Sequence, residues 1–221
     1  AARNGGAGNK NGQWLLDPSD VTVVHGSTGS LTAGVFDPPS TSSIGDTQIN
    51  TTLAAGTDVT IQTSGGTGGT GLIRINGNGD ANGAVEIVNR GGGTRTLNLS
   101  TAGAIDIRSG ALLSGQSGQS PNPLSVALTG SSITISGEID NQCGNTVLTG
   151  ATTLGGKISN GTLAASNTLT SSSGTLDHVS LTGTLNLAGG MFVGGNLTLE
   201  NGASLSQALR VLSKPWRWSC R

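Results

Sequence analysis

The residues best suited to chemistry are two carboxylates, Glu138 and Asp140, which stand two positions apart. In an extended strand these side chains share one face, so both would point outward while Ile139 faces a core. Paired carboxylates can act as the acid and the base in glycoside cleavage, but a solvated strand face is the more common meaning of the pattern. Glu138 and Asp140 are therefore the leading catalytic candidates only if the chain is an enzyme.

Basic side chains could complete a second kind of site. Asp106 and Arg108 flank Ile107 and would share one outer face, while Arg74 and Arg90 would lie on nearby strands. A polysaccharide lyase needs such an arginine beside acidic residues that bind Ca²⁺. Ordinary surface ion pairs have the same pattern and contribute little to stability, so this pattern identifies no site by itself.

A candidate metal ligand, Asp80, lies in the Gly-rich segment 76–83. Oxygen-rich turns that are punctuated by glycine can bind Ca²⁺. This segment has one carboxylate, and it lacks the nonapeptide repeat of Ca²⁺-binding β-solenoids. A plain turn is the simpler interpretation, so we expect no cofactor, and Asp80 is a weak calcium candidate.

The chain has 2 histidines, His25 and His178. His178 follows Asp177, which suggests a Ser-His-Asp hydrolase, but no Gly-x-Ser-x-Gly elbow sits between a strand and a helix. His25 lies in a Gly/Ser/Thr-rich loop. We interpret both histidines as solvent-exposed, and they are too few for a histidine-rich transition-metal site.

The composition limits the elements that could position these residues. Of 221 residues, 38 are glycine, 33% are hydrophobic, 10% are charged and 2% are aromatic, which excludes a helical bundle, a coiled coil and a charge-rich disordered chain. The net charge of −1 offers no clustered basic surface for nucleic acid. No apolar run approaches the roughly 20 residues of a transmembrane helix.

Short runs of alternating hydrophobic and polar residues predict strands separated by Gly, Asn and Ser turns. In each run the hydrophobic residues face a core and the residue between them faces solvent. Residues 14–24 predict a strand, a turn and a second strand, whereas residues 25–47 are loop-like. The clearest later runs are Val59–Ile61, Ile73–Ile75, Val85–Ile87, Leu97–Leu99, Ile105–Ile107, Val126–Leu128 and Ile133–Ile135.

An internal repeat links the strands near the end of the chain. A period of 18–21 residues with two or three short strands is typical of a β-solenoid, whose coils stack in parallel. A spacing of 18 aligns Leu163 with Leu181 and Leu199, and Leu169 with Leu187 and Leu205. A looser spacing of 20 or 21 aligns Val85, Ile105, Val126 and Val147, and also Leu113, Ile133 and Leu154.

The sequence therefore predicts an all-β fold, a single-stranded parallel β-helix over residues 14–206. We expect a right-handed helix of roughly 9–10 coils, each of about 18–21 residues. Residues 1–13 form a frayed lead-in, and residues 207–221 form an atypical tail that is either non-native or a cap. A β-sandwich is the structural alternative, but it would not show an ungapped repeat.

Two segments resemble filamentous-haemagglutinin-like exoproteins, the large secreted adhesins of Gram-negative bacteria. They are Trp14–Val23 (WLLDPSDVTV), which follows a Gly/Asn-rich lead, and Ile49–Ile61 (INTTLAAGTDVTI). The later GTL, LTG and LTLENGASL phrases are similar to the repeats of that family. The family's secretion domain carries Asn-Pro-Asn motifs, which the differently placed Pro121–Leu124 segment does not match. The resemblance therefore implies part of the β-helical shaft rather than the secretion domain.

Two hypotheses about function follow. The first is a non-catalytic rod that is secreted or displayed on the cell surface, is exported by an outer-membrane partner and presents a Ser/Thr/Asn-rich surface to a glycan or cell-surface ligand. End-to-end association through open coils is compatible with it. The second is a carbohydrate-active or ester-cleaving hydrolase or lyase with a shallow outer groove. Ice binding needs a flat threonine array, which Thr60, Thr96, Thr134 and Thr198 do not predict.

Overall fold

A computed structural model describes residues 19–64, 68–118, 121–165, 168–200, 202–206 and 210–211. The predicted lead-in over residues 1–13 lies outside these ranges. So do residues 14–18 and all of the predicted tail except Arg210–Val211. The predictions for those segments are therefore not tested.

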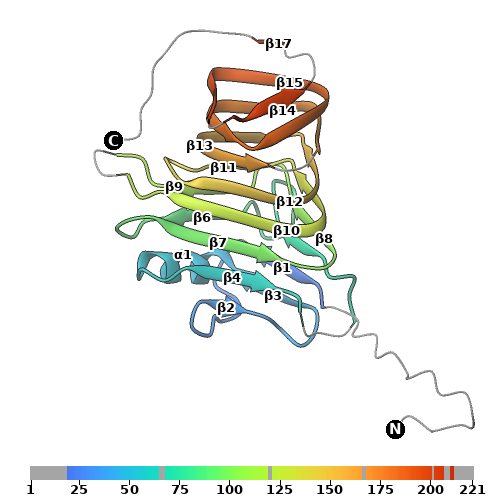
Figure 1. The fold of residues 1–221 in the computed structure, drawn as a ribbon. Helices are drawn as coiled ribbons and strands as arrows, with labels where there is room; N and C mark the ends of the chain where they lie inside the picture. Colours follow the sequence, from blue (N-terminus) through green and yellow to red (C-terminus); the bar gives the residue numbers. More distant parts are fainter. Residues whose placement is uncertain are drawn as a thin grey trace, which may run out of the picture.

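The strands stack in three columns, and within each column every pairing of neighbouring strands is parallel (Figure 1). The β7 column contains β2 (Val35–Phe36), β4 (Val59–Gln62), β7 (Arg95–Ser100), the first parts of β10 (Leu124–Ile135) and β12 (Asn145–Leu154), and the last parts of β13 (Lys157–Ala165), β14 (Thr168–Thr182) and β15 (Thr184–Leu199). The β8 column contains β3 (Ser42–Gly45), β1 (Val21–Val24), β5 (Ile73–Ile75), β8 (Ala104–Ile107), the last parts of β10 and β12, the first parts of β14 and β15, and β16 (Ser204–Ser206). The β9 column contains β6 (Glu86–Asn89), β9 (Leu112–Gly115), β11 (Glu138–Asp140), the first part of β13, the middle parts of β14 and β15, and β17 (Arg210–Val211).

From β7 onward the chain visits the β7, β8 and β9 columns in turn and then returns to the first. The first strands depart from this order, because β1 lies between β3 and β5 in the β8 column. The predicted all-β, parallel class is confirmed. The region 25–47, which we expected to be a loop, contributes β2 and β3.

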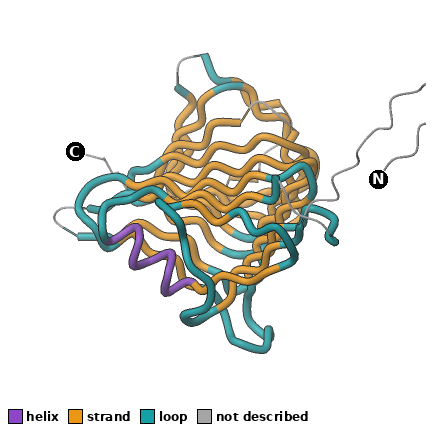
Figure 2. The backbone as a smooth tube through the Cα atoms, turned by 90° about the horizontal axis from the view of Figure 1, so that it is seen from below, coloured by secondary structure: helices purple, strands orange, loops and turns teal. Residues whose placement is uncertain are grey.

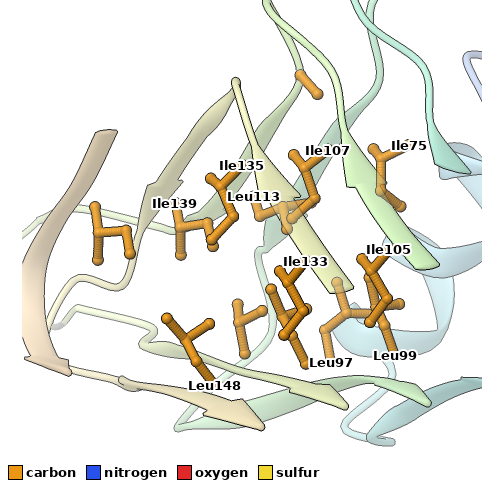
Figure 3. Packing of buried hydrophobic residues seen from close by; sticks show 14 of the residues in the cluster. Ile75, Leu97, Leu99, Ile105, Ile107, Leu113, Ile133, Ile135, Ile139 and Leu148 are labelled. Carbon is orange, nitrogen blue, oxygen red and sulfur yellow. The ribbon is translucent and has the colours of Figure 1, made fainter. Parts of the chain in front are cut away.

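Hydrophobic residues of equivalent strands stack on one another inside the columns. In the β8 column Ile75 pairs with Ile107, and Ile107 pairs with Ile135. In the β9 column Leu113 pairs with Ile139. All five side chains are buried (Figure 3). Burial of apolar surface contributes a stabilisation of about 25 cal/mol per Å². The stacked residues therefore stabilise the pairing of successive strands, as the alternating strand pattern predicts.

One helix, α1 (Asp46–Ala54), was not expected from the sequence. It lies beside the strands (Figure 2) and packs against β6. Ile49 and Leu53, one helical turn apart, are buried. Because β6 has no strand partner on the side away from β9 among the described residues, α1 covers an open edge of the β9 column, which a further strand could otherwise extend.

The strict 18-residue repeat is largely confirmed by the strand register. Leu163 pairs with Leu181, and Leu181 pairs with Leu199. Leu169 pairs with Leu187, as expected. The prediction for Leu205 is wrong, because it pairs with Leu185. A turn closed by a hydrogen bond from the Ala203 N–H to the Glu200 carbonyl shifts the last strand.

The looser upstream alignment is wrong. Ile105 pairs with Ile73 and Ile133, so it lies in another column than Val126. Val147 pairs with Ala127 and is 41% exposed. Loops of unequal length separate the upstream strands, so residues at a constant spacing in sequence do not return to the same column there.

Candidate functional site

Glu138 lies on β11 with its side chain on the outer face of the β9 column, because the next residue, Ile139, is buried. Its backbone is in register with Lys157 on β13. The Lys157 Nζ is 2.8 Å from the Glu138 Oε1 and 3.9 Å from the Asp177 Oδ2. Glu138 thus shares a face with Asp140, as predicted, but it is ion-paired to a lysine that the sequence analysis did not single out.

The environment of Lys157 favours its charged form. Partial burial lowers the pKa of the lysine, while Glu138, Asp177 and Asp140 raise it, so that the net pKa lies above its usual value. Lys157 therefore carries an ammonium group held between carboxylates of neighbouring strands.

Asp140 is held by amide groups. The Gln142 Nε2 donates to one carboxylate oxygen at 2.8 Å, and the Asn160 Nδ2 donates to the other at 2.9 Å. Asp140 pairs in register with Ser159, which pairs with Asp177. Both oxygens of Asp140 are therefore engaged within the protein, which does not resemble a carboxylate poised to act as a base.

His178 forms a pair with its neighbour, because the Nδ1 is 2.8 Å from the Asp177 Oδ1. His178 has a φ of 54°, and Asn160 has a φ of 55°, in the left-handed region. A Cβ on Gly195 would lie 2.4 Å from the His178 ring, so the imidazole packs directly on that backbone. The histidine is half-buried rather than solvent-exposed as expected.

A shallow groove of about 530 Å³ contains Glu138 and Lys157, whereas Asp140 is not among its lining residues. It crosses β9, β11, β13 and β14 at the corner where the chain enters the β9 column. We name it the Lys157 groove, and its lining is Gly110, Ala111, Leu112, Ser136, Gly137, Glu138, Gly155, Gly156, Lys157, Ser173 and Thr175.

The predicted basic and calcium candidates are distributed over separate ion pairs. Arg74 pairs with Asp106 across adjacent strands at 3.5 Å. Arg108 instead contacts Asp80, which also accepts a hydrogen bond from the Gly77 N–H at 2.7 Å. Arg90 pairs with Glu86 at 3.3 Å, so these arginines do not converge on one site. Within the described ranges, no His, Cys, Asp and Glu residues form a group of three that could hold a metal ion.

His25 is exposed, as predicted, and its Nδ1 is 2.9 Å from the nearly buried Asp46 Oδ2. Asp46 also accepts hydrogen bonds from the Gly26 N–H at 3.0 Å and the Glu86 N–H at 3.1 Å. Burial raises the pKa of Asp46, but these donors and His25 outweigh it and hold the pKa below its usual range. Asp46 is therefore a structural anchor between α1, the preceding loop and β6.

A second hollow, of about 570 Å³, lies on the outer face of the β8 column and has no charged lining residue. Thr134 pairs in register with Thr153, which pairs with Thr170. These three threonines alternate along their strands with buried residues and are exposed. We name this surface the threonine face, defined by the exposed residues Ser132, Thr134, Ala151, Thr153, Thr168 and Thr170.

The threonine face was not predicted, because the four threonines considered from the sequence lie in different columns. Thr60 lies in the β7 column and Thr134 in the β8 column, so the four threonines considered there do not form one array. Thr153 and Thr170 follow Thr134 at roughly one period, which was the available signal. The same spacing relates Lys157 to Glu138.

No known protein family, curated protein or solved structure matches this chain. In the part of the chain that the structure describes, no helix has the length and hydrophobicity needed to cross a membrane.

Proposed function

We propose that this chain is a non-catalytic rod segment of an exported β-helical adhesin, and that its threonine face binds uncharged glycans. The observation that carries the proposal is the in-register ladder Thr134–Thr153–Thr170 within a charge-free hollow. The hollow, at about 570 Å³, falls within the range of roughly 300–1,000 Å³ that small-molecule sites occupy.

Threonine suits this role because each side chain offers one hydroxyl and one methyl group. The hydroxyl can donate and accept hydrogen bonds to sugar hydroxyls, and the methyl group can contact the apolar face of a sugar ring. Strands about 4.8 Å apart repeat the pair along the stack. That distance is close to the length of one sugar unit in an extended chain, so a linear glycan can meet the same chemistry at each strand.

The β-helical part of the proposal is supported by the path of the chain through three parallel columns in a constant order. The stacked isoleucines and leucines of equivalent strands support it as well. Residues 14–23 and 49–61 resemble segments of filamentous-haemagglutinin-like exoproteins, which supports the adhesin assignment, secretion or surface display, and export by an outer-membrane partner.

The alternative of a groove hydrolase or lyase is less well supported by the contacts. Glu138 is paired with Lys157 at 2.8 Å, and Asp140 lies outside the groove lining and accepts two amide hydrogen bonds. The pair predicted to act as acid and base is thus engaged in the protein's own interactions.

The proposal is tested by binding of the purified chain to an array of neutral and charged glycans. The wild-type chain is compared with Thr153→Lys, which places a charge in the centre of the threonine face, and with Thr198→Lys, an exposed control on the β7 column. We expect neutral glycans to be retained by the wild type and by Thr198→Lys and lost by Thr153→Lys. Equal retention by all three, or binding to none of the glycans, would overturn the proposal.

A further inference from the structure

We propose that the Lys157 groove is a second binding site, and that it takes a linear glycan carrying free amino groups. This site lies on the β9 column, whereas the threonine face lies on the β8 column. The inference therefore goes beyond the glycan binding proposed above and does not depend on it.

The first observation is an excess of negative charge beside a bound ammonium group. Glu138, Asp140 and Asp177 all lie on the outer face of the β9 column, with Lys157 on the strand between them. The Lys157 Nζ lies 2.8 Å from Glu138 and 3.9 Å from Asp177. Three carboxylates against one ammonium group leave an excess of negative charge beside the groove. Glu138 lines the groove itself, whereas Asp140 and Asp177 lie outside its lining, and Asp177 is also 2.8 Å from the His178 Nδ1.

The second observation is Ser159, which is fully buried and whose Oγ has no hydrogen-bond partner among the described residues. Its neighbour Ile158 faces the core, so the Ser159 side chain lies on the same outer face as Lys157. In register it stands between Asp140 and Asp177. A buried hydroxyl without a partner is costly, and this one stands in register between two carboxylates, beside the groove rather than in its lining.

The groove has a shape that suits a long, narrow ligand. Glycines form its wall because the strands approach too closely for side chains: a Cβ on Gly156 would lie 1.9 Å from the Gly137 carbonyl oxygen. The groove crosses four neighbouring strands, so it runs along the stack for roughly 15 Å at the usual strand spacing.

The lining favours a sugar over a peptide. The hydroxyls of Ser136, Ser173 and Thr175 lie along the open groove, and they match a ligand with many hydroxyl groups. A peptide in extended form would need separate pockets for alternate side chains or a free strand edge. The strands that form the groove are paired on both sides.

The test uses two probes with the same sugar backbone, namely oligomers of glucosamine, which carry free amino groups, and the N-acetylated oligomers of the same length, in which each amine is an uncharged amide. Isothermal titration should show that the free-amine oligomer binds at least about tenfold more tightly, which corresponds to about 1.4 kcal/mol. The difference should shrink as salt is added, because exposed charges are screened.

The variants separate this site from general charge effects. Glu138→Gln and Asp177→Asn should each weaken binding of the free-amine oligomer several-fold. Lys157→Met should strengthen it, because the internal ammonium no longer competes. Arg74→Met removes the same charge from an ion pair on the β8 column and should leave the affinity unchanged.

Each other result contradicts the proposal in a distinct way. Equal affinity for the two oligomers, or no binding of either oligomer by the folded chain, would show that the groove has no preference for free amino groups. Weaker binding by Lys157→Met makes the lysine a ligand group rather than a competitor. Equal affinity for oligolysine of matched charge assigns the groove to basic peptides. Loss of free-amine binding in Thr153→Lys would place the amine site on the threonine face instead of in the groove.

Discussion

The carboxamide of Asn50 takes the place of a β-strand along the edge of β6, where it pairs with Val88. Its Oδ1 accepts a hydrogen bond from the Val88 N–H at 2.8 Å, and its Nδ2 donates to the Glu86 carbonyl at 2.8 Å. One turn earlier in α1, Asp46 accepts from the Glu86 N–H. The helix therefore satisfies strand-edge groups through side chains at i and i+4, which blocks pairing with another chain.

The first prediction concerns this edge. Asn50→Ala should lower the free energy of unfolding by about 1–2 kcal/mol, because two backbone groups of β6 lose their partners. Thr51→Ala, an exposed change on the same helix, should change it by less than about 0.5 kcal/mol. Urea unfolding measures both, and equal effects would show that the Asn50 contacts contribute little.

The second prediction concerns acid stability. The pKa of Asp46 is held below its ordinary value of 3.8 in the folded chain, so its ionised form stabilises the fold. This contribution is present above that value and is lost as the pH falls through the lower folded pKa. Asp46→Asn should therefore be less stable than wild type at neutral pH, with the gap closing in acid. A gap of constant size between pH 7 and pH 3 would contradict this.

The third prediction concerns the corner at His178, whose φ of 54° is unfavourable for most residues. His178→Asn should keep stability within about 1 kcal/mol, because asparagine tolerates this conformation and the half-buried Asp177–His178 pair is a single contact between adjacent residues. His178→Val should cost about 1–2 kcal/mol more, since left-handed backbone is strained for a β-branched residue. Thermal unfolding of the two variants measures their relative stability. A valine variant as stable as the asparagine variant would show that the left-handed backbone at this position imposes no strain.

The fourth prediction concerns close stacking at the glycine corner. Gly156→Ala should destabilise the chain by several kcal/mol, because the new Cβ would collide with the Gly137 carbonyl. A Cβ on Gly190 would have no atom within 4 Å, so Gly190→Ala serves as the matched control and should be nearly neutral. Comparable urea midpoints for the two variants would show that adjacent strands can separate at this corner.

The strands were predictable because alternation encodes which residues face the core. Ile73–Ile75, for example, forms β5, and Ile105–Ile107 lies within β8, both with the expected buried positions. The helix α1 was not predictable in this way. Asn50, Thr51 and Thr52 are poor helix formers, and α1 is stabilised by contact with β6, which local sequence does not encode.

The candidate site was predictable only in part. The shared face of Glu138 and Asp140 follows from their spacing along one strand. Their partners Lys157 and Asn160 lie on the next strand, so finding them requires the register between paired strands. The intervals from Thr134 to Thr153 and from Thr153 to Thr170 differ in length, so a search for one constant period does not align them.

The measurement that tests the central claim most directly is a titration of the isotope-labelled chain with a neutral oligosaccharide, followed by amide chemical shifts. Binding at the threonine face should shift the amides of Thr134, Thr153 and Thr170 together, while those of β4 and β7 stay unchanged. Shifts confined to another column, or no shifts with any neutral oligosaccharide, would contradict the assignment of this face as the binding surface.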